Sequence, residues 1–137
     1  MLIVMSPFWN RYALHEARLL NIEEMRKAAR RNIPVAGVFE ERNLKVSVYS
    51  QLAEEPNIAV VGDGNSFNMH HKVIIVDDAI VLTGSFNFTK SACSSNDENY
   101  VVISRNPGVA KQFVEEFNRV YKAAEQKLAA KGSGTTR

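Results

Sequence analysis

Several features are scarce in this chain of 137 residues, and each shortage excludes a class of protein. Cys93 is the only cysteine, so neither an intrachain disulfide nor a zinc site built from thiolates can form. No apolar run reaches the roughly 18 to 20 residues that a membrane-spanning helix needs. The apolar opening, Met1 to Met5, is too short for the core of a signal peptide and is better interpreted as a strand.

A strong net charge is also missing, because 17 basic residues nearly balance 15 acidic ones and leave a net charge of +2. Bulk electrostatics therefore gives only weak attraction for a polyanion. The content of 45% hydrophobic and 23% charged residues is typical of a folded globular domain. Arg26, Lys27, Arg30 and Arg31 crowd one segment. We interpret this basic cluster as a solvated helix face, with contact to nucleic acid as the alternative.

Hydrophobic periodicity predicts an α/β domain with a mixed β-sheet flanked by helices on both faces. Strands are predicted at residues 2–5, 35–39, 58–61, 69–76, 79–83 and 99–103, and helices at 12–31, at 43–55 and from Pro107 onward. Segment 43–55 also alternates like a strand, but Asn43 can cap a helix there and Pro56 can stop it. We expect one domain over residues 1–131 and a flexible tail over 132–137.

The final helix is predicted to face the core with an apolar stripe that recurs at three- and four-residue steps. The stripe contains Val109, Phe113, Phe117, Val120, Tyr121, Ala124 and Leu128.

The stretch most informative about chemistry is the predicted hairpin and the residues that follow it. Alternate side chains of a strand face the same side, so His70 and Lys72 project together while His71 points away. The turn after the second strand can bring Ser85 and Asn87 back beside them. An imidazole, an ammonium, a hydroxyl and an amide suffice to bind a phosphate and attack it. No pair of carboxylates stands nearby in the sequence, so we predict no metal and no cofactor.

These residues resemble the HKD signature of the phospholipase D superfamily in both identity and spacing. The matching positions are His70, Lys72, Asp77, Gly84, Ser85 and Asn87. Glu98 and the sequence of residues 84–90 resemble the small bacterial nucleases of that superfamily, which carry one motif copy. The resemblance runs from about Ala28 into the final helix and implies a phospholipase D-like fold.

The resemblance implies a mechanism in which His70 attacks phosphorus and forms a phosphohistidine, which water then cleaves. Lys72, Asn87 and Ser85 would hold the nonbridging oxygens, and a turn-capping role for Ser85 is an equal alternative. Glu98 would accept a hydrogen bond from the other ring nitrogen of His70.

Two further positions of the motif are predicted to be structural. Asp77 would anchor the hairpin turn away from phosphorus, and Gly84 would end the second strand.

In-line displacement needs an acid on the side opposite the nucleophile, and the chain has only three histidines. His71 faces away from His70, and His15 belongs to the predicted early helix. One chain therefore does not supply both groups. We predict a homodimer with two-fold symmetry in which two copies of His70 share one active site.

The leading prediction is a metal-independent, non-specific endonuclease that cleaves DNA or RNA. A phospholipase D-type lipid phosphodiesterase or phosphatidyl transferase is the second candidate, because its substrate is also a phosphodiester. A binding module that keeps the fold without turnover is the third. The expected location is the bacterial periplasm or the medium if a leader has been removed, and otherwise the cytoplasm.

Overall fold

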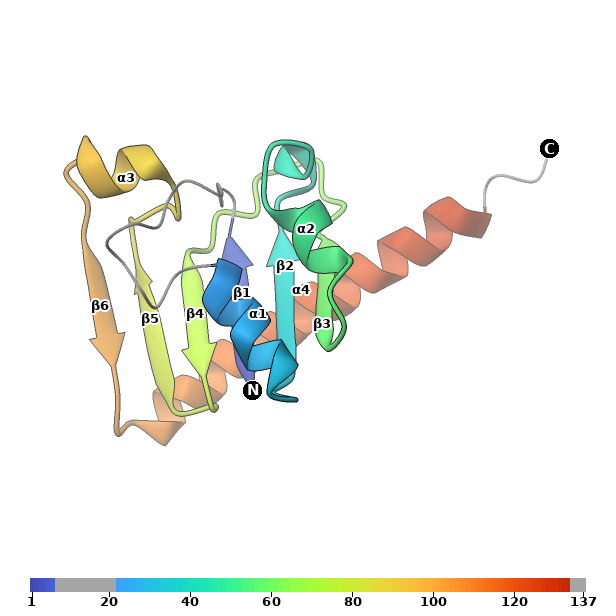
Figure 1. The fold of residues 1–137 in the computed structure, drawn as a ribbon. Coiled ribbons are helices and arrows are strands. Elements are labelled where there is room, and N and C mark those ends of the chain that lie inside the picture. Colours follow the sequence, from blue (N-terminus) through green and yellow to red (C-terminus); the bar gives the residue numbers. More distant parts are fainter. Residues whose placement is uncertain (7–21, 134–137) are drawn as a thin grey trace.

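Six strands form one mixed sheet in the computed structural model, which describes residues 1–6 and 22–133 (Figure 1). Their order across the sheet is β3-β2-β1-β4-β5-β6. The strands are β1 (Leu2–Ser6), β2 (Val35–Phe39), β3 (Ile58–Gly62), β4 (Val73–Val76), β5 (Ile80–Gly84) and β6 (Tyr100–Ile103). The strands β1 to β3 are parallel, whereas β4 runs antiparallel to β1 and continues into an antiparallel meander. The predicted mixed sheet is confirmed.

Helices cover both faces of the sheet, as predicted. On one face lie α1 (Ile22–Arg30) and α2 (Tyr49–Ala53), and on the other lies α4 (Pro107–Ser133). In the central strand β1, Val4 packs on the α1 side and Ile3 and Met5 pack on the α4 side, all three with 0% exposure. Each such side chain stabilises the fold by roughly 1.5–3 kcal/mol.

One edge of the sheet gathers the irregular segments. The parallel strands β1 to β3 end at this edge, β4 begins there, β5 ends there and β6 begins there, at the top of Figure 1. The short 3-10 helix η2 (Glu41–Asn43) and the helix α3 (Lys90–Ser94) lie at the same edge. Segments 63–72 and 85–99 therefore meet there, and we call it the upper edge.

The first strand of the predicted hairpin is shorter than expected, since β4 begins at Val73 rather than Met69. The ladder between β1 and β4 starts at the pair Met5–Val73, so residues 69–72 extend past it. The turn is confirmed: Asp77 and Asp78 both have φ of 53°, and the Ala79 N–H donates to the Val76 carbonyl oxygen at 3.1 Å. This geometry is typical of a tight hairpin turn.

The prediction of a helix over residues 43–55 is wrong for its first half. The side chain of Ser47 accepts the Tyr49 N–H and donates to the Leu44 carbonyl oxygen, so its hydroxyl replaces helical backbone bonds. The helix α2 therefore begins only at Tyr49. Val46 is 70% exposed, which also excludes the strand alternative there.

The two long predicted helices are partly confirmed. The first, expected at 12–31, is seen from Ile22 to Arg30, and residues 12–21 lie outside the described residues. In α4 the stripe is buried at Phe117 and Ala124, but Leu128 is 58% exposed because the helix extends beyond the sheet (Figure 1). The helix α4 continues to Ser133, and the rest of the predicted tail lies outside the described part. No helix of residues 22–133 is long and apolar enough to span a bilayer.

Candidate active site

The side chains of His70 and Lys72 meet at the upper edge, just before β4. The Lys72 Nζ lies 3.3 Å from Nδ1 and 3.2 Å from Nε2 of His70, and 3.1 Å from the His70 carbonyl oxygen. In the ring plane, a position equally close to both nitrogens would collide with the carbon between them. The ammonium therefore lies over the ring face, and the in-plane lone pair of His70 points elsewhere. His70 itself is exposed to solvent.

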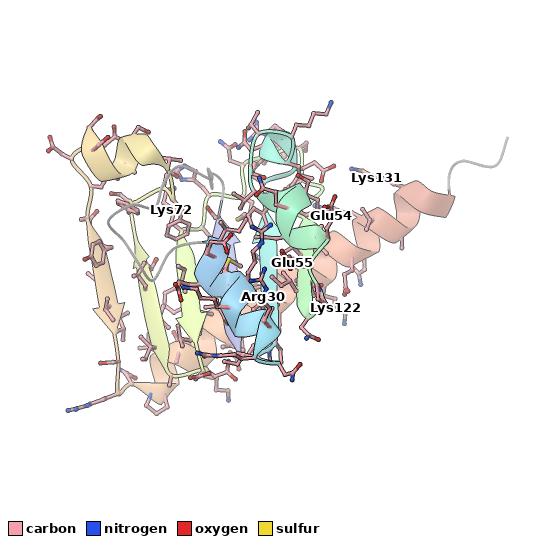
Figure 2. All side chains as sticks on the ribbon, in the orientation of Figure 1. Arg30, Glu54, Glu55, Lys72, Lys122 and Lys131 are labelled. Carbon is pink, nitrogen blue, oxygen red and sulfur yellow. The ribbon has the colours of Figure 1, made fainter. Side chains whose placement is uncertain are left out.

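Lys72 is a buried cation, with only 7% of its surface exposed. Burial lowers the pKa of the Lys72 ammonium, and attraction to the Glu98 carboxylate partly opposes that shift. Figure 2 shows Lys72 at the upper ends of β4 and β5. A partly desolvated cation of this kind interacts more strongly with an anion than a surface lysine does.

Ser85, at the end of β5, and Glu98, just before β6, lie at the same edge of the sheet, and Glu98 is close enough to interact electrostatically with Lys72. The Ser85 hydroxyl donates to Glu98 Oε2 at 2.5 Å and accepts the Asn99 N–H at 3.1 Å. Hydrogen bonds from Ser85 and then Asn96 lower the pKa of the Glu98 carboxyl, and nearby Lys72 contributes to the same effect. Ser85 thus ties the two strand ends together.

The expected bond between Glu98 and His70 is not formed in this structure. Among the described residues, Glu98 accepts hydrogen bonds from Ser85 and Asn96, while the His70 ring contacts the Lys72 ammonium. The physical reason is proximity, because Ser85 and Asn99 are bonded across the ends of β5 and β6 and hold Glu98 beside the Ser85 hydroxyl.

Gly84 allows the end of β5 and the start of β6 to approach each other closely. A Cβ at this position would collide with the carbonyl oxygen of Asn99 and the Cα of Tyr100. Only glycine fits here, so β6 can approach closely enough for Ser85 to reach Glu98. The prediction of a structural role for Gly84 is supported by this contact.

Asn87 lies in the turn that follows Ser85 and is half-buried. Its side-chain oxygen is buried and has no hydrogen-bond partner among the described residues. An unsatisfied buried polar atom costs free energy, and a functional role is one of the explanations for such an atom.

His71 faces away from His70, as predicted. Its Nε2 lies 3.3 Å from Glu116 of α4, which also pairs with Arg119 at 2.7 Å. The Arg119 guanidinium is the main cause of the lowered pKa of the Glu116 carboxyl. His71 therefore anchors the segment to the helix behind the sheet, whereas His70 and Lys72 face the site.

Other predicted residues lie elsewhere. Asp77 is at the lower end of β4, where its N–H donates to the Met1 carbonyl oxygen at 2.9 Å, far along the strand from Lys72. In the basic cluster, Arg26 pairs with Glu23 and Lys27 with Glu24. The cluster ends near the start of β2, at the lower edge, so its placement favours a solvated helix face. His15 lies outside the described residues.

Sequence reasoning missed Glu40, which follows β2 and is only 1% exposed. Its carboxylate accepts the Met69 N–H at 2.6 Å and the Arg42 Nε–H at 2.7 Å. An acidic residue directly after a buried strand was the available signal. Among the described residues, no group of three His, Cys, Asp or Glu side chains could hold a metal ion.

Comparison with known proteins identifies the family. A family model described as "Cardiolipin synthase, PLD-like domain" matches residues 2–121. The chain therefore belongs to the phospholipase D superfamily of phosphodiesterases, and the interpretation of the HKD motif is confirmed at the level of the family.

Individual relatives carry different names. A mitochondrial cardiolipin hydrolase of Xenopus laevis is 42% identical over 64 residues, which is 47% of this chain and 30% of that protein. A phospholipase D of Rickettsia bellii is 41% identical over 78 residues, or 56% of this chain and 38% of that protein. The chain thus spans about a third of the length of these curated relatives.

A solved structure has the same fold over most of its length. Nuc from Salmonella typhimurium, a phospholipase D family member, superposes with a TM-score of 0.73 at 30% identity. The match covers 89% of this chain and 78% of that one. The predicted fold class is confirmed.

Proposed function

We propose that this protein is a metal-independent endonuclease that cleaves phosphodiester bonds through a phosphohistidine on His70. The observation that carries the proposal is the contact of 3.2–3.3 Å between the buried Lys72 ammonium and the exposed His70 ring. A nucleophile with an accessible in-plane lone pair stands beside a cation that can bind the phosphate it attacks.

Each neighbouring group then has a role in the reaction. Lys72 binds a nonbridging oxygen, and the amide of Asn87 donates a hydrogen bond to another as negative charge grows. The position of Asn87 in the turn after β5, at the end of the sheet where Lys72 lies, supports this role. Glu98, held by Ser85, adds the negative charge that balances Lys72.

The second histidine comes from a second copy of the chain. His71 is bound to Glu116 on the other side of the segment, so it does not reach the phosphate that His70 attacks. In a two-fold dimer, the partner's copy of His70 protonates the leaving oxygen from the opposite side. The exposure of His70 at the upper edge supports this arrangement, because a buried ring would not be available to a partner.

A nucleic-acid substrate is favoured by the resemblance of Glu98 and residues 84–90 to the small bacterial nucleases of the superfamily. A lipid phosphodiesterase is the second candidate, and the specific observations behind it are the description of the matching family model and the names of the curated relatives.

The test is cleavage of supercoiled plasmid DNA and of cardiolipin vesicles, each in excess EDTA, by wild type and by the variant His70→Ala. We expect wild type to nick the plasmid and the variant to leave it intact. Cleavage of cardiolipin alone would replace the proposal with the lipid candidate. Plasmid cleavage that EDTA abolishes, or that His70→Ala retains, would contradict the mechanism.

A further inference from the structure

We propose that Glu40 is a positioning residue that holds His70 and Lys72 in reactive geometry through the backbone of Met69. This inference rests on the proposed function of the same site. The Glu40 carboxylate bonds Met69 and Arg42 rather than the side chains of His70 and Lys72. It acts on the segment that carries both.

The segment 69–72 needs such support because the sheet does not provide it. The ladder of β4 begins at Val73, so the four preceding residues have no strand pairing. The contacts that hold them among the described residues are the buried side chains of Met69 and Lys72, the bond from Lys72 Nζ to the His70 carbonyl oxygen, the contact of His71 with Glu116, and the bond from the Met69 N–H to Glu40. Of these, only the Glu40 bond ties a backbone atom of the segment to another element of the fold.

The bond itself has the properties of a strong anchor. The Glu40 carboxylate is 1% exposed and lies 2.6 Å from the Met69 nitrogen, a short distance typical of charge-assisted hydrogen bonds. Its other oxygen accepts from Arg42, whose side chain is about half exposed and links the buried charge to solvent. Loss of the carboxylate would leave the Met69 N–H without its acceptor in a buried setting.

The chain offers a graded set of variants at this contact. Glu40→Gln keeps an oxygen at the same reach, so it can still accept the Met69 N–H. Glu40→Asp keeps the charge but is one methylene shorter and cannot reach without backbone movement. Glu40→Ala removes the acceptor. Val35→Ala, a buried position at the opposite end of β2, is the matched control for loss of stability alone.

The experiment measures kcat and KM for bis(p-nitrophenyl) phosphate, a phosphodiester whose released p-nitrophenolate is measured by its absorbance. We expect Glu40→Ala and Glu40→Asp to lower kcat by about 10- to 100-fold, the loss expected when a catalytic group moves by about 1 Å. Glu40→Gln should recover most of kcat, and KM should change less than kcat throughout. Val35→Ala should lower the melting temperature but leave kcat unchanged.

Two results would overturn the proposal. One is a kcat of Glu40→Ala equal to that of Val35→Ala at a similar melting temperature. The other comes from NMR, which needs no turnover. If the His70 ring signals and the Met69 amide signal of Glu40→Ala equal those of wild type, Glu40 does not position the segment that carries His70. If wild type hydrolyses no phosphodiester, the proposed function fails, and the NMR comparison still decides the role of Glu40.

Discussion

The two ends of strand β4 carry residues of the same motif but are built in different ways. At the lower end, the turn at Asp77–Asp78 is closed by its own backbone, with one bond from the Ala79 N–H to the Val76 carbonyl oxygen. At the upper end, Lys72 and the residues before it lie outside the ladder and depend on side chains from other elements.

The difference separates stability from chemistry within one motif. The turn is held by its own backbone bond and by the neighbouring Met1, whose carbonyl oxygen accepts the Asp77 N–H, and it lies at the end of β4 opposite to Lys72. A segment held by distant side chains leaves His70 exposed and Lys72 desolvated, and both properties are needed to attack a phosphodiester. Substitutions at the two ends should therefore have opposite effects on activity and on stability.

The largest effect is expected for His70→Ala at the upper end. Loss of the nucleophile should lower kcat by at least about 10³-fold, because the remaining groups only bind and polarise the phosphate. The ring is exposed, so the melting temperature should change little. Steady-state kinetics and thermal unfolding measured on the same preparation check both parts. If the loss of activity equals the loss of folded protein, His70 contributes to stability rather than to chemistry, and the contrast between the two ends of β4 fails.

The next effect concerns Lys72 and the alkaline side of the pH profile. Burial lowers the Lys72 pKa below the ordinary 10.5, so kcat should fall as pH rises through that lower value. The unfolded chain holds this proton to higher pH, so stability should rise over the same window and unfolding does not explain the fall. The variant Lys72→Arg should be slower but should lack this alkaline limb, because a guanidinium stays charged. If Lys72→Arg shows the same fall of kcat at high pH as wild type, a group other than Lys72 causes that fall.

A smaller effect is expected for Ser85→Ala. Removal of the hydroxyl deletes the main cause of the lowered Glu98 pKa, so that pKa should rise toward its ordinary value of 4.5. Titration of the Glu98 carboxyl carbon by NMR measures this shift, and Asn96→Ala should produce a smaller one. We expect kcat to fall by about tenfold, less than for Lys72, if Ser85 acts by holding Glu98. A Glu98 pKa that does not move would refute the link.

The smallest effect on activity is expected at the lower end. Asp77→Val places a β-branched residue at φ of 53°, which should destabilise the fold by roughly 1–2 kcal/mol. Asp77→Asn tolerates that backbone angle and is the matched control. Chemical denaturation measures the difference, and kcat per folded molecule should stay at the wild-type value in both. A specific loss of kcat in Asp77→Asn would place Asp77 in the site.

Local pattern explains which parts of the site were predictable from sequence. Strand alternation placed His70 and Lys72 together and His71 apart, and that arrangement persists although the residues precede the ladder. Gly84 was predicted to end the second strand of the hairpin, and β5 ends there. These features involve residues that are close in the sequence, so the spacing of the residues is enough to predict them.

Contacts between distant elements were not predictable in the same way. The bond from Met69 to Glu40 depends on the order of β2, β1 and β4 across the sheet, and the two residues are 29 positions apart. The pairing of Glu98 with Ser85 rather than His70 depends on how the ends of β5 and β6 meet. The shortened helix has a different cause, because the Ser47 hydroxyl bonds its near neighbours Leu44 and Tyr49, and apolar spacing does not reveal that competition with the helix.

The most direct test of the account is a search for the covalent intermediate. Wild-type protein is mixed with excess DNA oligonucleotide, quenched in alkali during the first turnover, digested with trypsin and fragmented by mass spectrometry. The peptide that ends at Lys72 contains both His70 and His71, and fragmentation separates the two positions. We expect an adduct on His70 in which the phosphorus is bonded to the ring nitrogen and still carries one fragment of the cleaved strand, while the other fragment has left with its oxygen. An adduct on His71, or turnover with no adduct on either residue, would contradict it.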